Sequence, residues 1–488
     1  MPTGTLARWI RQDEIATGDR GWAFNLAVFR VVFLGAVVAP LAWRTLVWTA
    51  GVMPGLPRDT WAPVAFFAWL PPDVLTDARV AWALALANLV FVLLGLAGVR
   101  VRMTLGAATV LSLYVFGLMQ NAGKVDHYHH VIWFMALLAV GPSARFLSVD
   151  ALLGSRRGVS MPAGDALATL RAVWILFGLI YLGPGVAKLA SAMGEGWARP
   201  DHLRLIVWWQ WFARSLYQPG FAPAHWVDSV PSWLVGAAGL AVIAFEIGFA
   251  FLVLFRRARH VLAAAGPLFH LVNGVVLGIW FAFLVPAYVA LVDWAAILRR
   301  FGIADEPPAP AVGRPAGGRR VLVVAAVLIM AQAGTSAGRI LRPQWVGPVW
   351  PFDLYPTFAS RRAPEATLWE PRALLDDGSE RRLDARAWAR AFGSAARCRR
   401  VAEAILGEPD AARRRERSRD VAALLWHHET PEMRAASVAV TVYEVRYALA
   451  SLPRPIGEAL LYRFTLDELA QSPGASARSQ GAEAPSDQ

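Results

Sequence analysis

The chain is dominated by long apolar runs that alternate with short polar segments. Several runs continue for roughly 20 residues, the length with which a helix crosses about 30 Å of hydrocarbon. The pattern predicts nine such helices, over residues 22–42, 80–98, 103–119, 128–144, 170–188, 232–255, 260–278, 281–298 and 321–340. The fourth is the weakest, because only Val131 to Gly141 is uninterrupted, and the seventh and eighth are divided at Gly278-Ile279-Trp280.

The polar segments around these runs mark the limits of the predicted domains. We expect an N-terminal tail, a membrane domain, a basic Pro/Gly linker, a last transmembrane helix, a polar domain and a disordered tail, over residues 1–21, 22–298, 299–320, 321–341, 342–470 and 471–488. Residues 56–79 and 199–231 hold Pro, Trp and charged residues, a mixture typical of the membrane–water interface.

The polar domain mixes helical and strand patterns. Asp377-Gly378 stands between two stretches of strand character, which is a strong short-range signal for a β-hairpin. Residues 385–406 and 410–427 have arginine-rich helical patterns, and β-branched residues over 437–448 predict another strand. The fold class that follows is an all-α polytopic membrane bundle of about nine transmembrane helices with a small α+β C-terminal domain.

Composition supports this class and excludes several others. Hydrophobic residues make up 56% of the chain and charged residues 17%, against about 25% charged in an average globular protein. A cytosolic enzyme could not bury so much apolar surface. The single cysteine, Cys398, excludes an internal disulfide scaffold, and the length of the apolar runs argues against an outer-membrane barrel. The polar start of the chain lacks a signal-peptide pattern, so we expect the first helix to be retained.

The net charge of +12 comes from arginines that cluster in the loops between the apolar runs. Arginine and lysine favour the cytoplasmic ends of transmembrane helices, so this charge is explained by membrane orientation and we expect no nucleic-acid partner. The clustered arginines stand in the N-terminal tail and after the second, fourth, sixth and eighth runs: Arg8, Arg11, Arg20; Arg100, Arg102; Arg145, Arg156, Arg157; Arg256, Arg257, Arg259; Arg299, Arg300, Arg314, Arg319 and Arg320. We therefore expect a cytoplasmic N-terminus and an extracytoplasmic C-terminal domain.

The basic residues include 46 arginines but only two lysines, Lys124 and Lys188. Arginine stays protonated in proteins, whereas a desolvated lysine can become a neutral amine and accept a proton. Both lysines are expected at the outer ends of helices, where a lysine also commonly extends its charge to the interface. A general base and a purely interfacial lysine are the two interpretations of Lys188.

Four polar residues interrupt the apolar runs: Arg30, Glu246, His270 and Asn273. Such residues are costly in lipid and usually face a protein-lined cavity. Arg30 and Glu246 are expected either to neutralise each other as a structural pair or to belong to a functional pocket.

A cluster of histidines lies between the third and fourth runs, in NAGKVDHYHH. Helical spacing would place His127 and His130 on one face and His129 on another. The cluster offers a metal site as an alternative, but no second group of ligands at suitable spacing accompanies it, and no metal is predicted. Phosphate-binding loops and the common hydrolase motifs are absent from the sequence.

These segments together resemble the vitamin K-dependent γ-carboxylase family, including bacterial members with the horizontally transferred transmembrane domain. The resemblance covers about residues 20–300 and depends on the order and spacing of its motifs. They are LAVFRVVFLG (26–35), His127 with the run to SVDALL (148–153), PGVAKL (184–189) followed by GEGW, AFEIGFAFLVLF (244–255) and FHLVN (269–273). Ala187 stands where the family has the first lysine of its pair.

The resemblance implies a membrane enzyme of the bacterial inner membrane. It implies that Lys188 is the base toward a reduced vitamin K or other quinol, that His127 assists, and that Arg30, Glu246, His270 and Asn273 belong to the cofactor site. The implied reaction couples quinol epoxidation by O2 to carboxylation, with CO2, of a peptide or protein glutamyl substrate. The alternative is a non-catalytic quinone- or lipid-binding membrane protein of the same fold.

Overall fold

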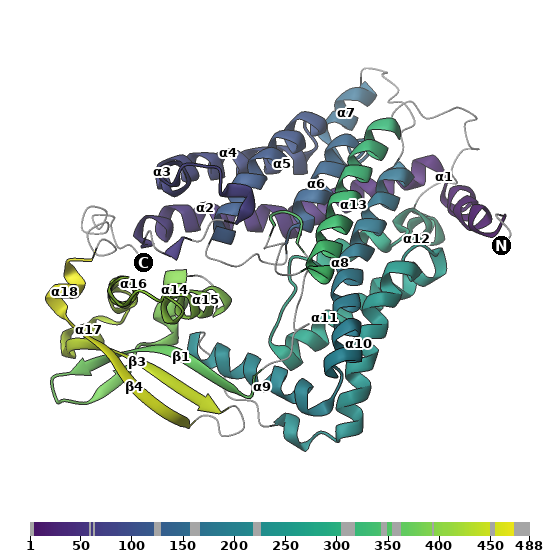
Figure 1. Ribbon diagram of the computed structural model, residues 1–488. Helices are drawn as coiled ribbons and strands as arrows, with labels where there is room; N and C mark the ends of the chain where they lie inside the picture. Colours follow the sequence, from purple (N-terminus) through teal and green to yellow (C-terminus); the bar gives the residue numbers. More distant parts are fainter. Residues whose placement is uncertain are drawn as a thin grey trace.

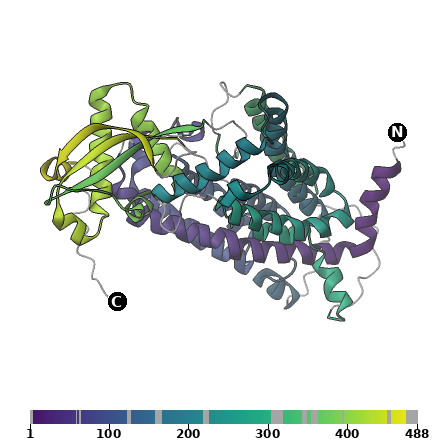
Figure 2. The same cartoon turned by 90° about the horizontal axis from the view of Figure 1, so that it is seen from below.

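Long helices make up most of the computed structural model (Figure 1). It describes residues 4–57, 60–61, 64–121, 128–156, 166–217, 226–303, 318–342, 349–353, 363–392, 395–448 and 454–472. The helices form a bundle, and a smaller domain of helices and strands adjoins one end of it. The start of the chain lies at the opposite end of the bundle, as the view from below also shows (Figure 2).

Seven helices of the described residues are long and apolar enough to cross a membrane. The first covers Arg20–Gly51: it consists of the part of α1 (Gly4–Phe33) that follows a kink at Gly18, a short π-helical stretch (Leu34–Val38) and α2 (Ala39–Gly51). The others are α4 (Ala78–Ala97), α5 (Val101–Leu118), α8 (Ala166–Glu195), α10 (Ser232–Leu252), α11 (Arg256–Leu277) and α13 (Gly318–Leu341). Large apolar side chains such as Leu240, Val261 and Met330 are exposed on their outer faces, as lipid contact requires. The chain is therefore a helical membrane protein.

The expectation of a long helix is wrong for two of the nine runs. The fourth run forms only α6 (His130–Val140), which ends at Gly141 because the following Pro142 disfavours a helical conformation for the residue before it. The eighth run forms a 3-10 helix (Val285–Leu291) and the short α12 (Trp294–Arg300). Pro286 lies inside this run, where it has no N–H to donate to a helical hydrogen bond.

Both short segments nevertheless run back through the bundle. After α6, the Asp150 carboxylate accepts hydrogen bonds from the Arg100 and Val101 backbone (3.0 and 3.4 Å), at the turn between α4 and α5. After the 3-10 helix, the Asp293 carboxylate accepts hydrogen bonds from Asn25 of α1 (3.0 Å) and from Arg256 at the start of α11 (3.2 Å). The segment after α11 has thus returned along the whole length of that helix.

Shorter elements complete the bundle. They are α3 (Pro72–Thr76), α7 (Val149–Arg156), α9 (Pro200–Tyr217) and 3-10 turns at Met53–Gly55, Ala65–Phe67, Met119–Asn121 and Trp226–Ser229. The helix α9 lies within the segment expected at the interface. Its buried Trp209, Phe212 and Leu216 belong to the core of the smaller domain, so α9 joins that domain to the bundle.

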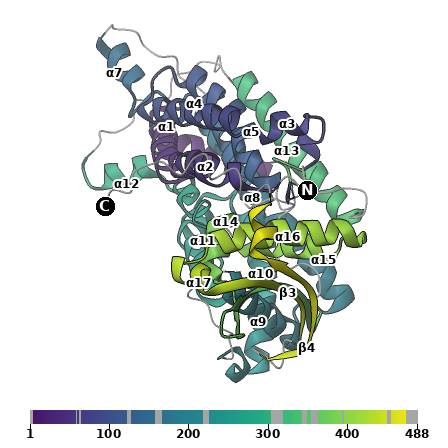
Figure 3. The ribbon, with the colours of Figure 1, turned by 90° about the vertical axis from the view of Figure 1, so that its left-hand side faces the viewer.

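The smaller domain is a four-stranded antiparallel sheet covered on one face by helices (Figure 3). The strands β1 (Glu365–Leu375), β2 (Glu380–Arg382), β3 (Ser437–Ala448) and β4 (Pro455–Thr465) have the order β2-β1-β3-β4. The helices are α14 (Ala385–Phe392), α15 (Ala395–Leu406), α16 (Ala411–His427), α17 (Pro431–Ala436) and α18 (Leu466–Ala470). The hairpin at Gly378, the helices and β3 are confirmed, whereas β4 was not predicted.

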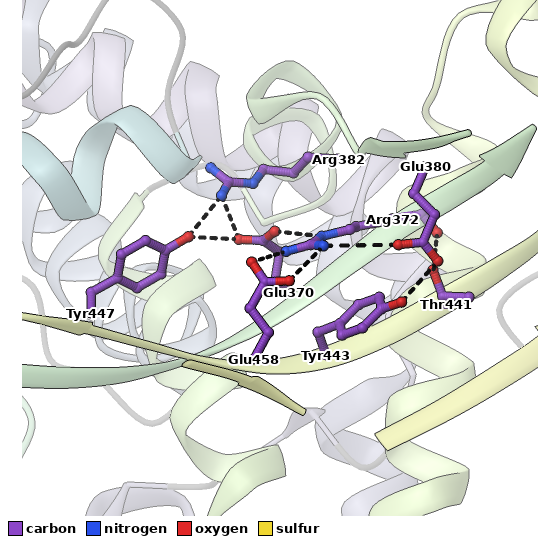
Figure 4. Close-up of polar contacts among 8 residues, drawn as sticks. All are labelled: Glu370, Arg372, Glu380, Arg382, Thr441, Tyr443, Tyr447 and Glu458. Carbon is purple, nitrogen blue, oxygen red and sulfur yellow. Dashed lines mark hydrogen bonds and ion pairs between the residues drawn. The ribbon is translucent and has the colours of Figure 1, made fainter. Parts of the chain in front are cut away.

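The core of this domain is apolar, and its other sheet face carries charges. Cys398 is fully buried, and burial raises the pKa of its thiol. On the polar face, Arg372 of β1 makes an ion pair with Glu370 (2.8 Å) and with Glu458 of β4 (2.9 Å; Figure 4). Burial raises the pKa of Tyr447, beside this network, to about 12. The Glu458 contact joins β1 to β4, which are separated in the sheet by β3.

Candidate functional site

Lys188 lies near the end of α8, where its ammonium makes a hydrogen-bonded ion pair with Glu246 of α10. Both side chains are buried, with 4% of Lys188 and 6% of Glu246 exposed. The Lys188 ammonium also lies 5.6 Å from the centre of the Trp197 ring, within the range of a cation–π contact. Lys188 is therefore a desolvated lysine inside the protein and does not extend to the interface.

Close approach of two helices makes this pair possible. A Cβ atom at Gly185 would lie 3.0 Å from the Glu246 Cβ and 2.9 Å from Ile247, which is tighter than ordinary side-chain contact. Because Gly185 precedes Lys188 by about one turn of α8, the two helices approach each other next to the lysine. The PGVAKL segment thus supplies both the close contact and the charge.

The pair lies at the wall of a cavity of about 310 Å³ between α8, α9, α10 and α11. Three more polar residues line it: Tyr181, His270 and Asn273. Most of the remaining lining is aliphatic or aromatic. An apolar cavity with a few convergent polar groups is the usual form of a small-molecule site. Four of the six residues predicted for the site, Lys188, Glu246, His270 and Asn273, therefore come together here.

His270 takes part in a second buried polar group. The Tyr181 hydroxyl lies 2.6 Å from His270 Nε2 and is hydrogen-bonded to the Tyr288 hydroxyl, which lies 3.4 Å from the same nitrogen. A Cβ atom at Gly266 would lie 1.8 Å from the Tyr288 ring, so only glycine lets this ring pack one turn before His270. The two tyrosines fix one side of the imidazole.

Two polar atoms of the cavity residues lack hydrogen-bond partners within the described part of the chain: Glu246 Oε2 and His270 Nδ1. A buried polar atom without a partner costs about 1–3 kcal/mol. A ligand with its own polar groups would satisfy both atoms. The cavity is thus suited to an amphiphilic molecule whose polar head lies toward Lys188, Glu246 and His270.

The expected pairing of Arg30 with Glu246 is wrong. Arg30 is fully buried, but its guanidinium donates hydrogen bonds to the carbonyl oxygens of Ser143 (2.8 Å) and Leu147. Arg30 is not among the described residues that line the cavity. These hydrogen bonds connect α1 to the segment that follows α6. An arginine in an apolar run predicts burial, but its hydrogen-bond acceptors can be backbone carbonyls in place of a carboxylate.

Replacing Arg30 by methionine is expected to destabilise the protein, because the Ser143 and Leu147 carbonyls would lose a donor, at about 1–3 kcal/mol for each buried group left unpaired. Arg30→Lys should recover only part of the loss, since one ammonium lacks the two-pronged geometry of guanidinium. Thermal unfolding in lipid nanodiscs measures the change. The folded fraction of each variant should still bind quinone. If an Arg30 variant lost quinone binding while its thermal stability stayed unchanged, Arg30 would belong to the cofactor site after all.

The histidine segment is described only in part. His127 and Lys124 lie outside the described residues. His130 Nε2 lies 2.9 Å from the Phe283 carbonyl oxygen, whereas the ring of His129 packs against Trp133 and Trp350. The described residues contain no group of three His, Cys, Asp or Glu side chains that could hold a metal ion.

Sequence reasoning missed the two tyrosines and Trp197. Tyr181, Gly185 and Lys188 follow each other at spacings of four and three residues, so they share one face of α8, and this spacing could have indicated Tyr181. Tyr288 lies in an irregular segment, and no periodicity indicates its direction.

Comparison of the chain with protein-family models, with curated proteins and with solved structures gives no match. Function is therefore inferred from the geometry of the cavity and from the sequence motifs.

Proposed function

We propose that the protein is a membrane enzyme that uses a reduced quinone and O2, and that Lys188 is the general base toward the quinol. The observation that carries the proposal is the buried Lys188–Glu246 pair at the wall of an apolar cavity. The motifs around these residues, PGVAKL and AFEIGFAFLVLF, are those that resemble the vitamin K-dependent γ-carboxylase family.

Direct contact between the two side chains supports a base role. A proton can pass from the Lys188 ammonium to the Glu246 carboxylate along their hydrogen bond, and the amine that remains can accept a proton from a quinol hydroxyl. Apolar walls keep water away and favour neutral species over separated charges. His127 is proposed to assist, and the acceptor is proposed to be a glutamyl side chain that takes up CO2.

The rim of the cavity supports a ligand that is soluble in lipid. Trp226, Leu234 and Val272 line the cavity, and 46%, 45% and 51% of their surfaces are exposed. All three are apolar, and the last two lie on α10 and α11, whose outer faces are apolar. A quinone with a long apolar chain would place its head inside and its chain between these helices.

We also propose nine crossings of a bacterial inner membrane, two of them made by the short segments. Irregular backbone is tolerated at membrane depth where protein surrounds it. Ala287, Tyr288, Ala290 and Leu291 of the 3-10 segment are buried, which meets this condition. Nine crossings with cytoplasmic arginine loops place the N-terminus inside and Lys188 with the C-terminal domain outside.

Cysteine labelling tests this orientation. In a Cys398→Ser background, Met193→Cys at the end of α8 should react with an impermeant reagent in intact cells, and Ile303→Cys should react only after lysis. Both native side chains are exposed, by 82% and 70%, which makes them matched positions. Labelling of position 303 but not of position 193 in intact cells would show that the protein has the opposite orientation.

The activity is tested with purified protein in nanodiscs, reduced naphthoquinone and O2, with the quinone epoxide followed by mass spectrometry. Glutamyl peptide and labelled bicarbonate are added in separate reactions. Epoxide without carboxylated peptide would support quinol oxygenation with another acceptor. A co-purified quinone with no epoxide from any quinol would favour the alternative, a quinone-binding membrane protein.

A further inference from the structure

We infer that the backbone carbonyl oxygen of Ile180, which Pro184 leaves without its helical donor, is a further ligand-binding group of the cavity. It accepts a hydrogen bond from a hydroxyl of the reduced ligand, so that the cavity prefers a quinol to the corresponding quinone. The inference deepens the proposed quinol site and rests on it for the class of ligand.

A proline removes one hydrogen bond from α8 beside the cavity. In an α-helix the carbonyl of residue 180 accepts from the N–H of residue 184, but Pro184 lies inside α8 and has no N–H. Outside the helix itself, none of the hydrogen bonds among the described residues ends on the Ile180 oxygen. Because a carbonyl oxygen has two lone pairs, this group keeps an acceptor position that α8 does not use.

The unused acceptor position lies at the wall of the cavity. Ile180 and Pro184 both line the cavity and are buried, and Lys188 lines it one turn further along α8. The three residues follow each other at a spacing of four, so they share one face of the helix. The missing hydrogen bond between residues 180 and 184 is therefore on the face that α8 turns toward the cavity.

The surroundings of this carbonyl offer few donors. At membrane depth, a backbone group freed by a proline is usually satisfied by neighbouring side chains, often Ser or Thr, or by water. The described residues that line the cavity include no Ser or Thr, and most of them are apolar. A hydroxyl group on the bound ligand can supply the missing donor.

The acceptors of the cavity distinguish the two redox forms of such a ligand. The Ile180 carbonyl and Glu246 Oε2, which has no hydrogen-bond partner within the described chain, both require donors. A quinol carries two hydroxyl donors on opposite sides of its ring, whereas the quinone carries only acceptors. The Lys188 side chain leans toward the start of α8, so one hydroxyl can reach the carbonyl while the other faces the Lys188–Glu246 pair.

Replacing Pro184 by alanine tests the inference, because alanine restores the N–H that the Ile180 carbonyl would accept. The ratio of the Kd of an alkyl naphthoquinone to the Kd of its quinol is measured without O2 on protein in nanodiscs. We expect wild-type protein to bind the quinol more tightly. In Pro184→Ala the ratio should fall by about 5-fold, the effect of one ordinary hydrogen bond.

The matched control is the proline inside α11, the neighbouring helix. Pro267→Ala restores a helical N–H in the same way, toward the Ala263 carbonyl. Neither Pro267 nor Ala263 is among the described residues that line the cavity. The ratio of the two Kd values should therefore stay at the wild-type value in Pro267→Ala.

Infrared spectroscopy observes the carbonyl directly in the wild-type protein. In protein labelled with 13C=O-isoleucine, the Ile180 band is identified by its absence from an Ile180→Leu sample. The quinol should lower the frequency of this band, because its hydroxyl donates to the oxygen, and the quinone should leave the band unchanged. This measurement decides even if Pro184→Ala does not fold.

Two results would overturn the inference: an unchanged ratio of Kd values in Pro184→Ala, or an Ile180 band that responds equally to quinol and quinone. Wild-type protein that binds neither form would reject both the inference and the proposed function. The expected binding preference without epoxide in the activity assay would reject only the proposed oxygenation. Epoxide formation with an Ile180 band that the quinol does not shift would reject only the inference.

Discussion

Replacing Lys188 by arginine is expected to lower the rate of quinol oxygenation by about 10²–10⁴-fold, the contribution typical of a positioned general base. Arginine keeps the positive charge and the pairing with Glu246, but guanidinium cannot give up its proton and act as a base. Lys188→Arg should therefore be as damaging as Lys188→Ala. The rate of epoxide formation, followed by mass spectrometry under O2, measures the effect.

A matched control places the same guanidinium elsewhere on the helix. Met193 lies near the end of α8 and is 82% exposed, so Met193→Arg should leave the rate near that of the wild type. Quinone binding and thermal unfolding of each variant separate lost chemistry from lost structure. Epoxide formation by Lys188→Arg at the wild-type rate would reject Lys188 as the base.

The long helices could be predicted from the sequence because their signal is local. Seven apolar runs became long helices, since hydrocarbon-length stretches have few other ways to satisfy their backbone. The failures occurred where a proline cancelled the pattern. Pro142 and Pro286 were visible in the sequence. The helices were predicted from the hydrophobicity of long runs, however, and a single proline among many apolar residues changes that hydrophobicity little.

Pairing in the site could not be predicted in the same way. Arg30, Lys188 and Glu246 were all recognised as costly in lipid, and all are buried. Which of them meet depends on the register of helices distant in sequence. Glu246 meets Lys188 because Gly185 lets α8 and α10 approach closely, whereas Arg30 reaches two carbonyls that any residue could supply. Composition and periodicity contain no information about such register.

The cavity itself was only partly visible in the sequence. FHLVN placed His270 and Asn273 on one face of a helix, and the lysine count drew attention to Lys188. Tyr288 reaches His270 from a segment that was expected to be a regular helix and is not. An error in secondary structure thus concealed a residue of the site, because the direction of its side chain depends on irregular backbone.

Removing one partner of the Lys188–Glu246 pair is expected to cost about 3–5 kcal/mol of stability, because the other partner would stay buried without its counter-charge. Lys188→Met and Glu246→Leu should each lower the midpoint of thermal unfolding. The double variant should be close to the wild type, since two apolar side chains of similar volume replace both charges and neither is left unpaired. Epoxide formation should remain lost in the double variant.

This separation of stability from activity distinguishes a catalytic pair from a purely structural one. The control is an exposed pair of the C-terminal domain, Arg400 and Glu403 (3.1 Å), whose single substitutions should each cost no more than about 1 kcal/mol. If Lys188→Met/Glu246→Leu loses as much stability as the two single changes together, the side chains do not interact in the folded protein. If the double variant forms epoxide at the wild-type rate, the pair has no part in the chemistry, because a methionine at position 188 has no group that can accept a proton from a quinol.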